Sequence, residues 1–237
     1  MFDAKRLLDQ FLGPNSVGGL QQRANALGQR AGVGNIGSRD VGSAAIGAGL
    51  TALLMGAGRG RRGMGIGELG GMAAIGMLAY QGYKKWQAGQ GATAIPAMPW
   101  GEPPPSGTPF NPISVPEQQS LGRHLLRAMI AAAKSDGHMD AAEQQTVFAQ
   151  MDKMNLDAAD KAFVIDELRA PLDVAAVARG ARNPEEAAEI YTASLLAVDV
   201  DQPSERAYLS QLAQHLKLDP KLAEHLHATV EHATVTA

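Results

Sequence analysis

The chain has 237 residues, a formal net charge of −3 and no cysteine. Its length allows one or two domains, and the lack of cysteine excludes disulfides and thiolate metal sites. Residues 1–110 carry 10 basic and 5 acidic side chains, whereas residues 111–237 carry 11 basic and 19 acidic ones. An acidic second half argues against nucleic acid as a partner, because phosphate binding needs clustered positive charge.

Residues 1–40 are expected to form an N-terminal region that is loosely ordered except for one short helix. Residues 2–12 place Phe2, Leu8, Phe11 and Leu12 near one side of such a helix. An amphipathic helix of this kind suits a membrane interface and an ordinary protein surface equally well. The segment from Gly32 to Gly37 matches the dinucleotide-binding pattern GxGxxG, but no apolar strand precedes it, so this function is excluded.

Residues 41–86 are rich in glycine and predict a membrane anchor. The candidate spans are 41–57, which has no charged residue, and 64–83, whose only charge is Glu68. Both are short for a spanning helix, which takes about 20 residues. Small residues recur every fourth position, as helices packed in lipid require, and an aromatic and basic belt follows at Tyr80, Tyr83, Lys84, Lys85 and Trp86. The alternative is a flexible tail, because glycine disfavours helices in water.

Residues 87–116 form the expected linker. Eight prolines lie between Pro96 and Pro116, and this density is typical of a stiff spacer of the polyproline type. A ligand for a proline-binding domain is the alternative interpretation.

Residues 117–237 predict an acidic, all-α domain of about seven short helices. Helix-start signals recur, with a capping residue followed by proline or acidic residues. Apolar residues follow at helical spacing, and no strand-like alternation is present. The predicted starts are at Asp140, Asp157, Asp173, Asn183, Gln202 and Asp219.

Two acidic loops of this half echo one another, AAAKSDGHMDAAE at 131–143 and LLAVDVDQPSERAYLSQLAQHLKLDP at 195–220. These phrases resemble the tellurite-resistance TerB-like all-α fold, and the whole chain resembles inner-membrane proteins of unknown function of the YebE type. The resemblance implies a bacterial inner-membrane protein, whose helical domain we expect on the cytoplasmic side, and it implies no catalytic activity. It also implies that the paired loops bind a divalent cation through six carboxylates, those of Asp136, Asp140, Glu143, Asp199, Asp201 and Glu205.

The residues themselves leave the cation open. Calcium and magnesium need several oxygen ligands at once, and neither loop is a complete calcium-binding hand, because the twelfth position counted from Asp136 is Val147. Only the two loops together would hold Ca²⁺ or Mg²⁺. The alternative is that Asp140, Glu143 and Glu205 simply cap helices.

The functional hypothesis is a membrane-anchored, non-enzymatic protein whose helical domain binds an unknown protein partner, in an envelope or metal-stress role that comes from the resemblance alone. The expected partners are the lipid bilayer, that protein and a second copy bound through glycine-rich helices, with no nucleic acid. Two alternatives remain, a Mg²⁺-dependent enzyme that uses the paired acidic loops and a purely structural oligomer. No serine, histidine and aspartate stand in a recognisable nucleophile context.

Overall fold

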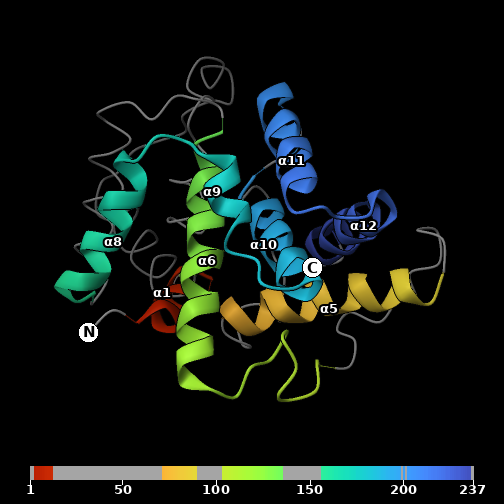
Figure 1. Ribbon diagram of the computed structural model, residues 1–237, viewed down its shortest axis with the longest axis horizontal. Helices are drawn as coiled ribbons and strands as arrows, with labels where there is room; N and C mark the ends of the chain where they lie inside the picture. The colour runs from red at the N-terminus through yellow and green to blue at the C-terminus, as the bar shows by residue number, and fades with distance from the viewer. Residues whose placement is uncertain are drawn as a thin grey trace, which may run out of the picture.

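The computed structural model describes residues 3–12, 71–89, 103–135, 156–198, 200 and 202–235. The described residues contain helices and no strand, which confirms the all-α prediction for this part of the chain (Figure 1). The helices are α1 (Ala4–Leu12), α5 (Gly71–Gln87), α6 (Val115–Ala133), α8 (Ala158–Arg169), α9 (Val174–Ala178), α10 (Pro184–Ala197), α11 (Pro203–His215) and α12 (Pro220–Val235).

Helix α10 is the central helix of the bundle. Every residue from Glu186 to Ala197 is buried, because α5, α6, α11 and α12 all contact this helix (Figure 1). Helix α6 runs beside α10 in the same direction. Leu121 and Glu186, near the two helix starts, line one cavity, and further along Ser194 Oγ donates to the backbone oxygen of Ala128 at 3.4 Å. The C-terminal ends of α6 and α10 therefore lie at the same end of the molecule.

Side-chain caps fix where several helices begin. Asp157 accepts a hydrogen bond from the Asp160 backbone N–H at 2.9 Å, and Asp173 accepts one from that of Ala176 at 2.9 Å. Asn183 does the same for Glu186 at 2.8 Å. Each bond satisfies an N–H group that the first helical turn leaves without a partner. The starts predicted at these three residues are confirmed.

Helix α5 corrects the prediction of a membrane span at 64–83. The helix begins at Gly71 and packs against α1, α10 and α12, so its apolar residues contact protein. None of the described helices combines the length and the hydropathy needed to cross a bilayer. The predicted transmembrane segment is thus wrong for its described part, and the inner-membrane localisation inferred from it is contradicted too. The other candidate span, 41–57, lies outside the described residues.

Glycine spacing misled the sequence interpretation because close packing needs small residues in protein as well as in lipid. A β-carbon at Gly82 would stand 2.7 Å from Cδ2 of Leu226 on α12, closer than non-bonded carbon atoms approach. The aromatic residues predicted for a membrane boundary also contact protein. The rings of Tyr80 and Tyr83 each lie 5.5 Å from that of Phe110, at edge-on or tilted angles that aromatic pairs favour.

Phe110 belongs to residues 103–114, which form a turn in the expected linker. The Gly107 N–H donates to the Asn111 oxygen at 2.8 Å, and the Asn111 N–H donates to the Thr108 oxygen at 2.9 Å. Gly107 has φ = 84°, a left-handed conformation that glycine adopts without strain. The turn buries Phe110 in the same hydrophobic core as the leucines of α1, α6 and α10.

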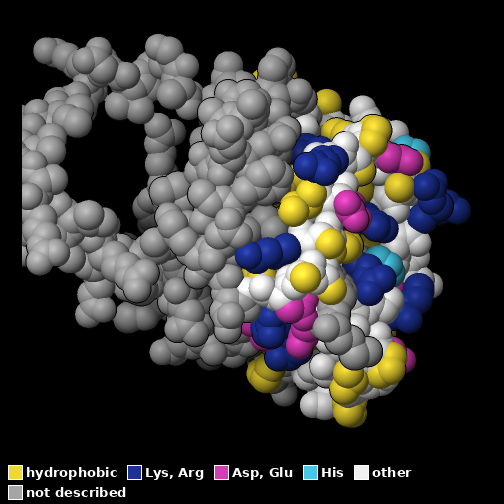
Figure 2. Space-filling view, turned by 90° about the vertical axis from the view of Figure 1, so that its left-hand side faces the viewer, with side chains coloured by type: hydrophobic (Ala, Val, Ile, Leu, Met, Phe, Trp, Pro, Cys, Tyr) yellow, Lys and Arg dark blue, Asp and Glu magenta, His cyan; other side chains and the backbone are white. Residues whose placement is uncertain are grey.

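On the face shown in Figure 2, the described surface carries basic, acidic and hydrophobic side chains together. Lys and Arg side chains are spread over that face among acidic and hydrophobic ones, and they form no continuous patch on its described part (Figure 2). The excess of acidic over basic residues between 111 and 237 therefore does not give this described face a single sign of charge.

Candidate functional site: a cavity at the start of helix α10

The first turn of α10 forms one wall of a cavity, and local sequence fixes its position. Asn183 caps the helix, and Pro184 occupies the first helical position, where its missing N–H costs no hydrogen bond. Glu185 and Glu186 follow, and their negative charges interact favourably with the positive end of the helix dipole. The start of α10 is therefore well defined.

An ion pair between Arg182 and Glu186 shapes that wall. Arg182 Nε and Nη2 donate to Glu186 Oε1 at 3.0 and 2.6 Å, and the Arg182 backbone N–H donates to Oε2 at 3.0 Å. The Glu186 residue is only 3 % exposed, so its charge needs this compensation. Hydrogen bonds with Glu186 and its negative charge raise the pKa of the Arg182 guanidinium. The guanidinium is thereby held in one place.

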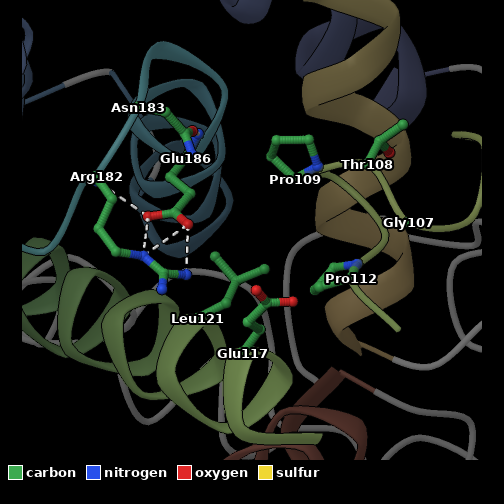
Figure 3. A pocket seen from close by; sticks show the side chains of 9 residues that line it. All are labelled: Gly107, Thr108, Pro109, Pro112, Glu117, Leu121, Arg182, Asn183 and Glu186. Atoms are coloured by element: carbon green, nitrogen blue, oxygen red, sulfur yellow. Dashed lines mark hydrogen bonds and ion pairs between the residues drawn. The ribbon is translucent and has the colours of Figure 1, made fainter. Parts of the chain in front are cut away.

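The cavity has a volume of about 340 Å³ and lies between three segments (Figure 3). Helix α10 and the residues before it form one side, α6 forms the floor, and the turn at 107–112 forms the other side (Figure 3). Its lining residues are Gly107, Thr108, Pro109, Pro112, Glu117, Leu121, Arg182, Asn183 and Glu186.

Two exposed apolar residues lie next to the cavity-lining residues in the sequence. Ile113 and Val115, which follow the lining residue Pro112, are 70 % and 65 % exposed. They are the most exposed large hydrophobic side chains in the described part of the chain. Single exposed hydrophobic residues need no explanation, but two that adjoin a cavity extend the apolar surface available to a ligand.

The cavity is slightly acidic. Arg182 contributes one positive charge, whereas Glu117 and Glu186 contribute two negative ones. Glu186 forms the ion pair, while exposed Glu117 acts on Arg182 only through its charge, which raises the pKa of the guanidinium further. The cavity therefore favours a ligand that carries positive charge beside apolar groups.

The lining residues include one hydroxyl group. Thr108 supplies the one hydroxyl among them, and its O–H donates to the Pro105 oxygen at 2.7 Å.

Five of the six predicted cation ligands, Asp136, Asp140, Glu143, Asp199 and Asp201, lie outside the described residues. The sixth, Glu205, lies half-buried in the first turn of α11. Among the described residues, no group of three or more potential ligands from His, Cys, Asp and Glu comes together. Cation binding by the two loops remains a prediction.

Sequence reasoning missed Arg182, Glu186 and a third residue, Glu189. The four-residue separation of Arg182 and Glu186 is the spacing of helical ion pairs and was an available signal. Glu189 is fully buried on α10, and neither of its carboxyl oxygens has a hydrogen-bond partner in the described part of the chain. Burial raises the pKa of the Glu189 carboxyl well above its usual range, and the neighbouring Glu186 charge raises it further. Nothing in the amino-acid pattern distinguishes this glutamate from the exposed ones.

Comparison with known proteins adds sequence relatives. Residues 40–230 match the family model described as protein of unknown function, DUF533. The chain is also similar to an uncharacterised protein in the ampR 5′ region of Yersinia enterocolitica, with 34 % identity over 96 residues, 40 % of this chain and 69 % of that protein. No solved structure matches the chain.

Proposed function

The chain belongs to the DUF533 family, and we propose that it is a non-enzymatic protein whose helical domain binds a short segment of a partner protein at the cavity beside α10. The observation that carries this proposal is an acidic cavity whose lining residues Pro112 and Glu117 flank the exposed apolar residues Ile113 and Val115 in the sequence. The partner segment places a lysine or arginine in the cavity near Glu117 and an apolar side chain against Ile113 and Val115.

The negative charge at the cavity supports a positively charged partner segment. Among the described residues, Glu117 at the cavity has no ion pair with a guanidinium, because Arg182 is engaged by Glu186. A charge at the edge of an interface mainly increases the association rate and selects among partners. The interaction is therefore expected to weaken as salt is added.

Apolar burial supports a weak, reversible interaction. Full burial of a valine or isoleucine side chain contributes about 1.5–3 kcal/mol, and association itself costs at least about 4 kcal/mol in lost freedom. Ile113, Val115 and one charge pair give a modest surplus over that cost. A dissociation constant in the micromolar range corresponds to a binding free energy on the order of −8 kcal/mol. We expect this affinity only when further contacts are added around the cavity.

Selection from a random peptide library tests the proposal without knowledge of the natural partner. The full chain is immobilised, and binders are counter-selected on Glu117→Lys and Ile113→Asp chains. Recovered peptides should share a basic residue next to an apolar one and should bind each variant at least about tenfold more weakly.

Two matched variants serve as controls for that selection. Leu172→Asp changes another exposed apolar residue, and Glu224→Lys reverses another exposed charge; both should retain the peptides. Peptides that bind all variants equally, or that carry acidic residues, would refute the proposed site.

Divalent-cation binding is a second proposed function, supported by the relation between α6 and α10. The acidic loops follow these two helices in the sequence, and the helices end at the same end of the molecule. Carboxylates must approach together to hold Ca²⁺ or Mg²⁺ at about 2.0–2.6 Å. The TerB-like resemblance and its metal-stress role belong to this proposal, and a Mg²⁺-dependent enzyme would use the same loops.

A further inference from the structure

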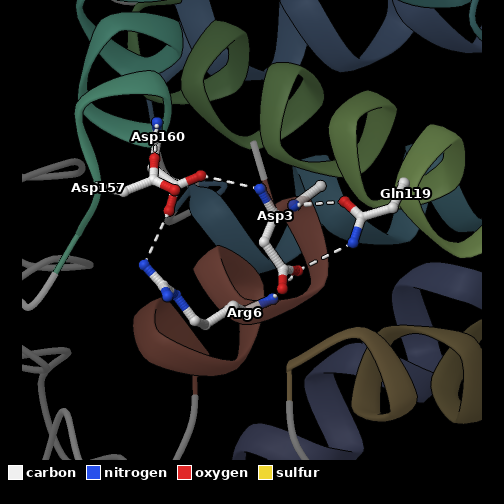
Figure 4. Close-up of polar contacts among 6 residues, drawn as sticks. Asp3, Arg6, Gln119, Asp157 and Asp160 are labelled. Atoms are coloured by element: carbon white, nitrogen blue, oxygen red, sulfur yellow. Dashed lines mark hydrogen bonds and ion pairs between the residues drawn. The ribbon is translucent and has the colours of Figure 1, made fainter. Parts of the chain in front are cut away.

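The described residues include three buried acidic side chains, those of Asp160, Glu186 and Glu189. Two of them are matched by donors, as buried charges require. Asp160 accepts hydrogen bonds from the Asp3 backbone N–H at 2.9 Å and from the Arg6 guanidinium at 3.1 Å (Figure 4). Glu186 has its ion pair with Arg182. Glu189 differs from both.

Glu189 lies in the interior of the bundle without such a donor. The residue is 0 % exposed, and neither carboxyl oxygen is hydrogen-bonded within the described part of the chain. Buried polar groups in native proteins are nearly always hydrogen-bonded, so an exception calls for a physical explanation. That explanation must lie in the groups that pack against this carboxyl.

The Glu189 carboxyl and the backbone oxygen of Phe110 meet at Gly76. A β-carbon at Gly76 would overlap the Phe110 oxygen and would stand 3.2 Å from Glu189 Oε1. Within the described residues, no donor is hydrogen-bonded to the Phe110 oxygen. Two oxygens without donors therefore lie on the same side of one glycine, where there is no room for a β-carbon. A proton on the carboxyl supplies the missing donor without additional space.

The charges around Glu189 also favour its protonated form. Burial, and then the negative charge of Glu186, raise the pKa of the Glu189 carboxyl far above that of an exposed glutamate. The turn at 103–114 carries no titratable side chain. No lysine or arginine of the described residues shifts this pKa. The helices packed against α10 carry tyrosines and histidines that do not shift it either, namely Tyr80 and Tyr83 on α5, His124 on α6, Tyr208 on α11, and His225 and His227 on α12.

Few contacts hold the turn at 107–112 on the helices. The backbone hydrogen bonds of Gly107 and Asn111 lie inside the turn. In the described part of the chain, one hydrogen bond joins the turn to a helix, from Gln118 Nε2 to the Pro112 oxygen at 2.7 Å. The Phe110 ring adds an apolar contact with two tyrosines of α5. Segments with few attachments open at a lower free energy than the helices they cover.

We propose that Glu189 controls the turn at 103–114 by its protonation state: the protonated carboxyl donates a hydrogen bond to the Phe110 oxygen and keeps the turn on α10, whereas ionisation releases the turn. A carboxylate has no proton to donate, and its charge repels the partial negative charge of the carbonyl oxygen. Because the turn forms one side of the cavity beside α10, its release changes the shape of that cavity. The switch acts on the cavity wall and requires no ligand.

The direction of the pH dependence follows from the two states of Glu189. In the released form the carboxyl meets water and has a pKa near the ordinary value of 4.5. Below that pH both forms are protonated, and the turn stays on α10. Above it, the ratio of released to bound turn rises by up to about tenfold per pH unit, until the pKa of the bound form is reached.

Nuclear magnetic resonance of the full chain tests the proposal. Carbon-13 labelling of glutamate side chains follows the Glu189 carboxyl, whose signal is assigned by its absence from the Glu189→Gln chain. Nuclear Overhauser contacts between the rings of Phe110 and Tyr80, whose centroids lie 5.5 Å apart, report the position of the turn. From about pH 5 to about pH 9, the carboxyl should ionise and the ring contact should be lost with one shared midpoint.

Two variants separate Glu189 from the other titrating groups. Glutamine cannot ionise, and its amide N–H can donate to the Phe110 oxygen at every pH, so Glu189→Gln should keep the ring contact over the whole range. The matched control Glu224→Gln removes an exposed carboxyl of α12. This control should lose the ring contact at the wild-type midpoint.

Each of three results would overturn the proposal. The first is a Glu189 carboxyl that titrates near 4.5 or that stays protonated until the whole chain unfolds. The second is a wild-type ring contact that survives the ionisation of Glu189. The third is loss of that contact in Glu189→Gln at the wild-type midpoint. None of these measurements uses a peptide, so their outcome is independent of the library selection at the cavity.

Discussion

Gly76 of α5 lies directly against the backbone oxygen of Phe110, and a β-carbon at position 76 would overlap that oxygen. The same β-carbon would lie 3.2 Å from Oε1 of Glu189. Three segments, α5, the turn at 103–114 and α10, therefore meet at one glycine. Their packing depends on the absence of a side chain there.

Replacing Gly76 by alanine should destabilise the protein. Although alanine favours helices, its methyl group would overlap a backbone oxygen that cannot move aside like a flexible side chain, and such overpacking costs about 1–3 kcal/mol. The free energy of unfolding in urea measures the loss. Ala73→Ser on the exposed side of α5 is the control and should change stability by less than about 0.5 kcal/mol. A Gly76→Ala chain as stable as wild type would contradict this packing.

Replacing Glu189 by glutamine should stabilise the protein, and the gain should grow with pH. The pKa of the Glu189 carboxyl is raised in the folded protein by burial and by Glu186, relative to the ordinary value of 4.5. Above pH 4.5 the unfolded chain releases this proton while the folded protein retains it. Stability therefore falls as pH rises towards the folded pKa.

Urea unfolding between pH 4.5 and pH 8 measures this dependence. Glutamine cannot ionise, so Glu189→Gln should remove the fall, and its gain should grow by up to about 1.4 kcal/mol per pH unit above pH 4.5 until the folded pKa is reached. The exposed Glu224→Gln variant should keep the wild-type dependence. Parallel stability curves for wild type and Glu189→Gln would show that this carboxyl is not the source.

Removing the Arg182 side chain should destabilise the start of α10. In Arg182→Ala the buried Glu186 carboxylate loses its guanidinium, and we expect a loss of about 1–3 kcal/mol. Arg182→Lys should restore only part of it, because an ammonium group cannot donate in a fork. Arg179→Ala breaks a pair whose side chains are 70 % and 56 % exposed, and should cost less than about 0.5 kcal/mol. Equal effects at positions 179 and 182 would refute the role of the buried pair.

Divalent cations should raise the thermal midpoint of the full chain if the acidic loops bind them. An ion at one hundred times its dissociation constant stabilises the folded state by about 2.7 kcal/mol. Differential scanning calorimetry with millimolar Ca²⁺ or Mg²⁺, followed by chelation, measures the change. Asp136→Asn combined with Asp199→Asn should abolish it. An unchanged midpoint in the wild type would contradict cation binding and would mean that the carboxylates only cap helices.

The sequence predicted local structure more successfully than the environment of each helix. The starts of α8, α9 and α10 were predictable because Asp157, Asp173 and Asn183 bond backbone groups only three residues away. The surroundings of α5 were not, because glycines among apolar residues suit a lipid interior and a tight protein contact equally well. Only the tertiary structure shows that Leu226 and Phe110 occupy the space beside its glycines.

The candidate site was less predictable than the helices for the same reason. The acidic loops attracted attention because their residues are close together in the sequence, whereas the cavity combines residues from 107–112, 117–121 and 182–186. No continuous segment of the sequence contains all three groups of lining residues, so the sequence alone does not indicate the cavity. Arg182 and Glu186 alone had a recognisable spacing, and that spacing is common on helix surfaces.

The packing of the buried Phe110 ring against Tyr80 and Tyr83 has a practical consequence for recombinant work. A fragment starting at residue 117, where the acidic half begins, would remove this ring together with α1 and α5 and leave α10 and α12 with bare apolar flanks. Such a truncation should aggregate when expressed by itself. The smallest fragment with a complete hydrophobic core includes helices from before the proline-rich segment as well as those after it.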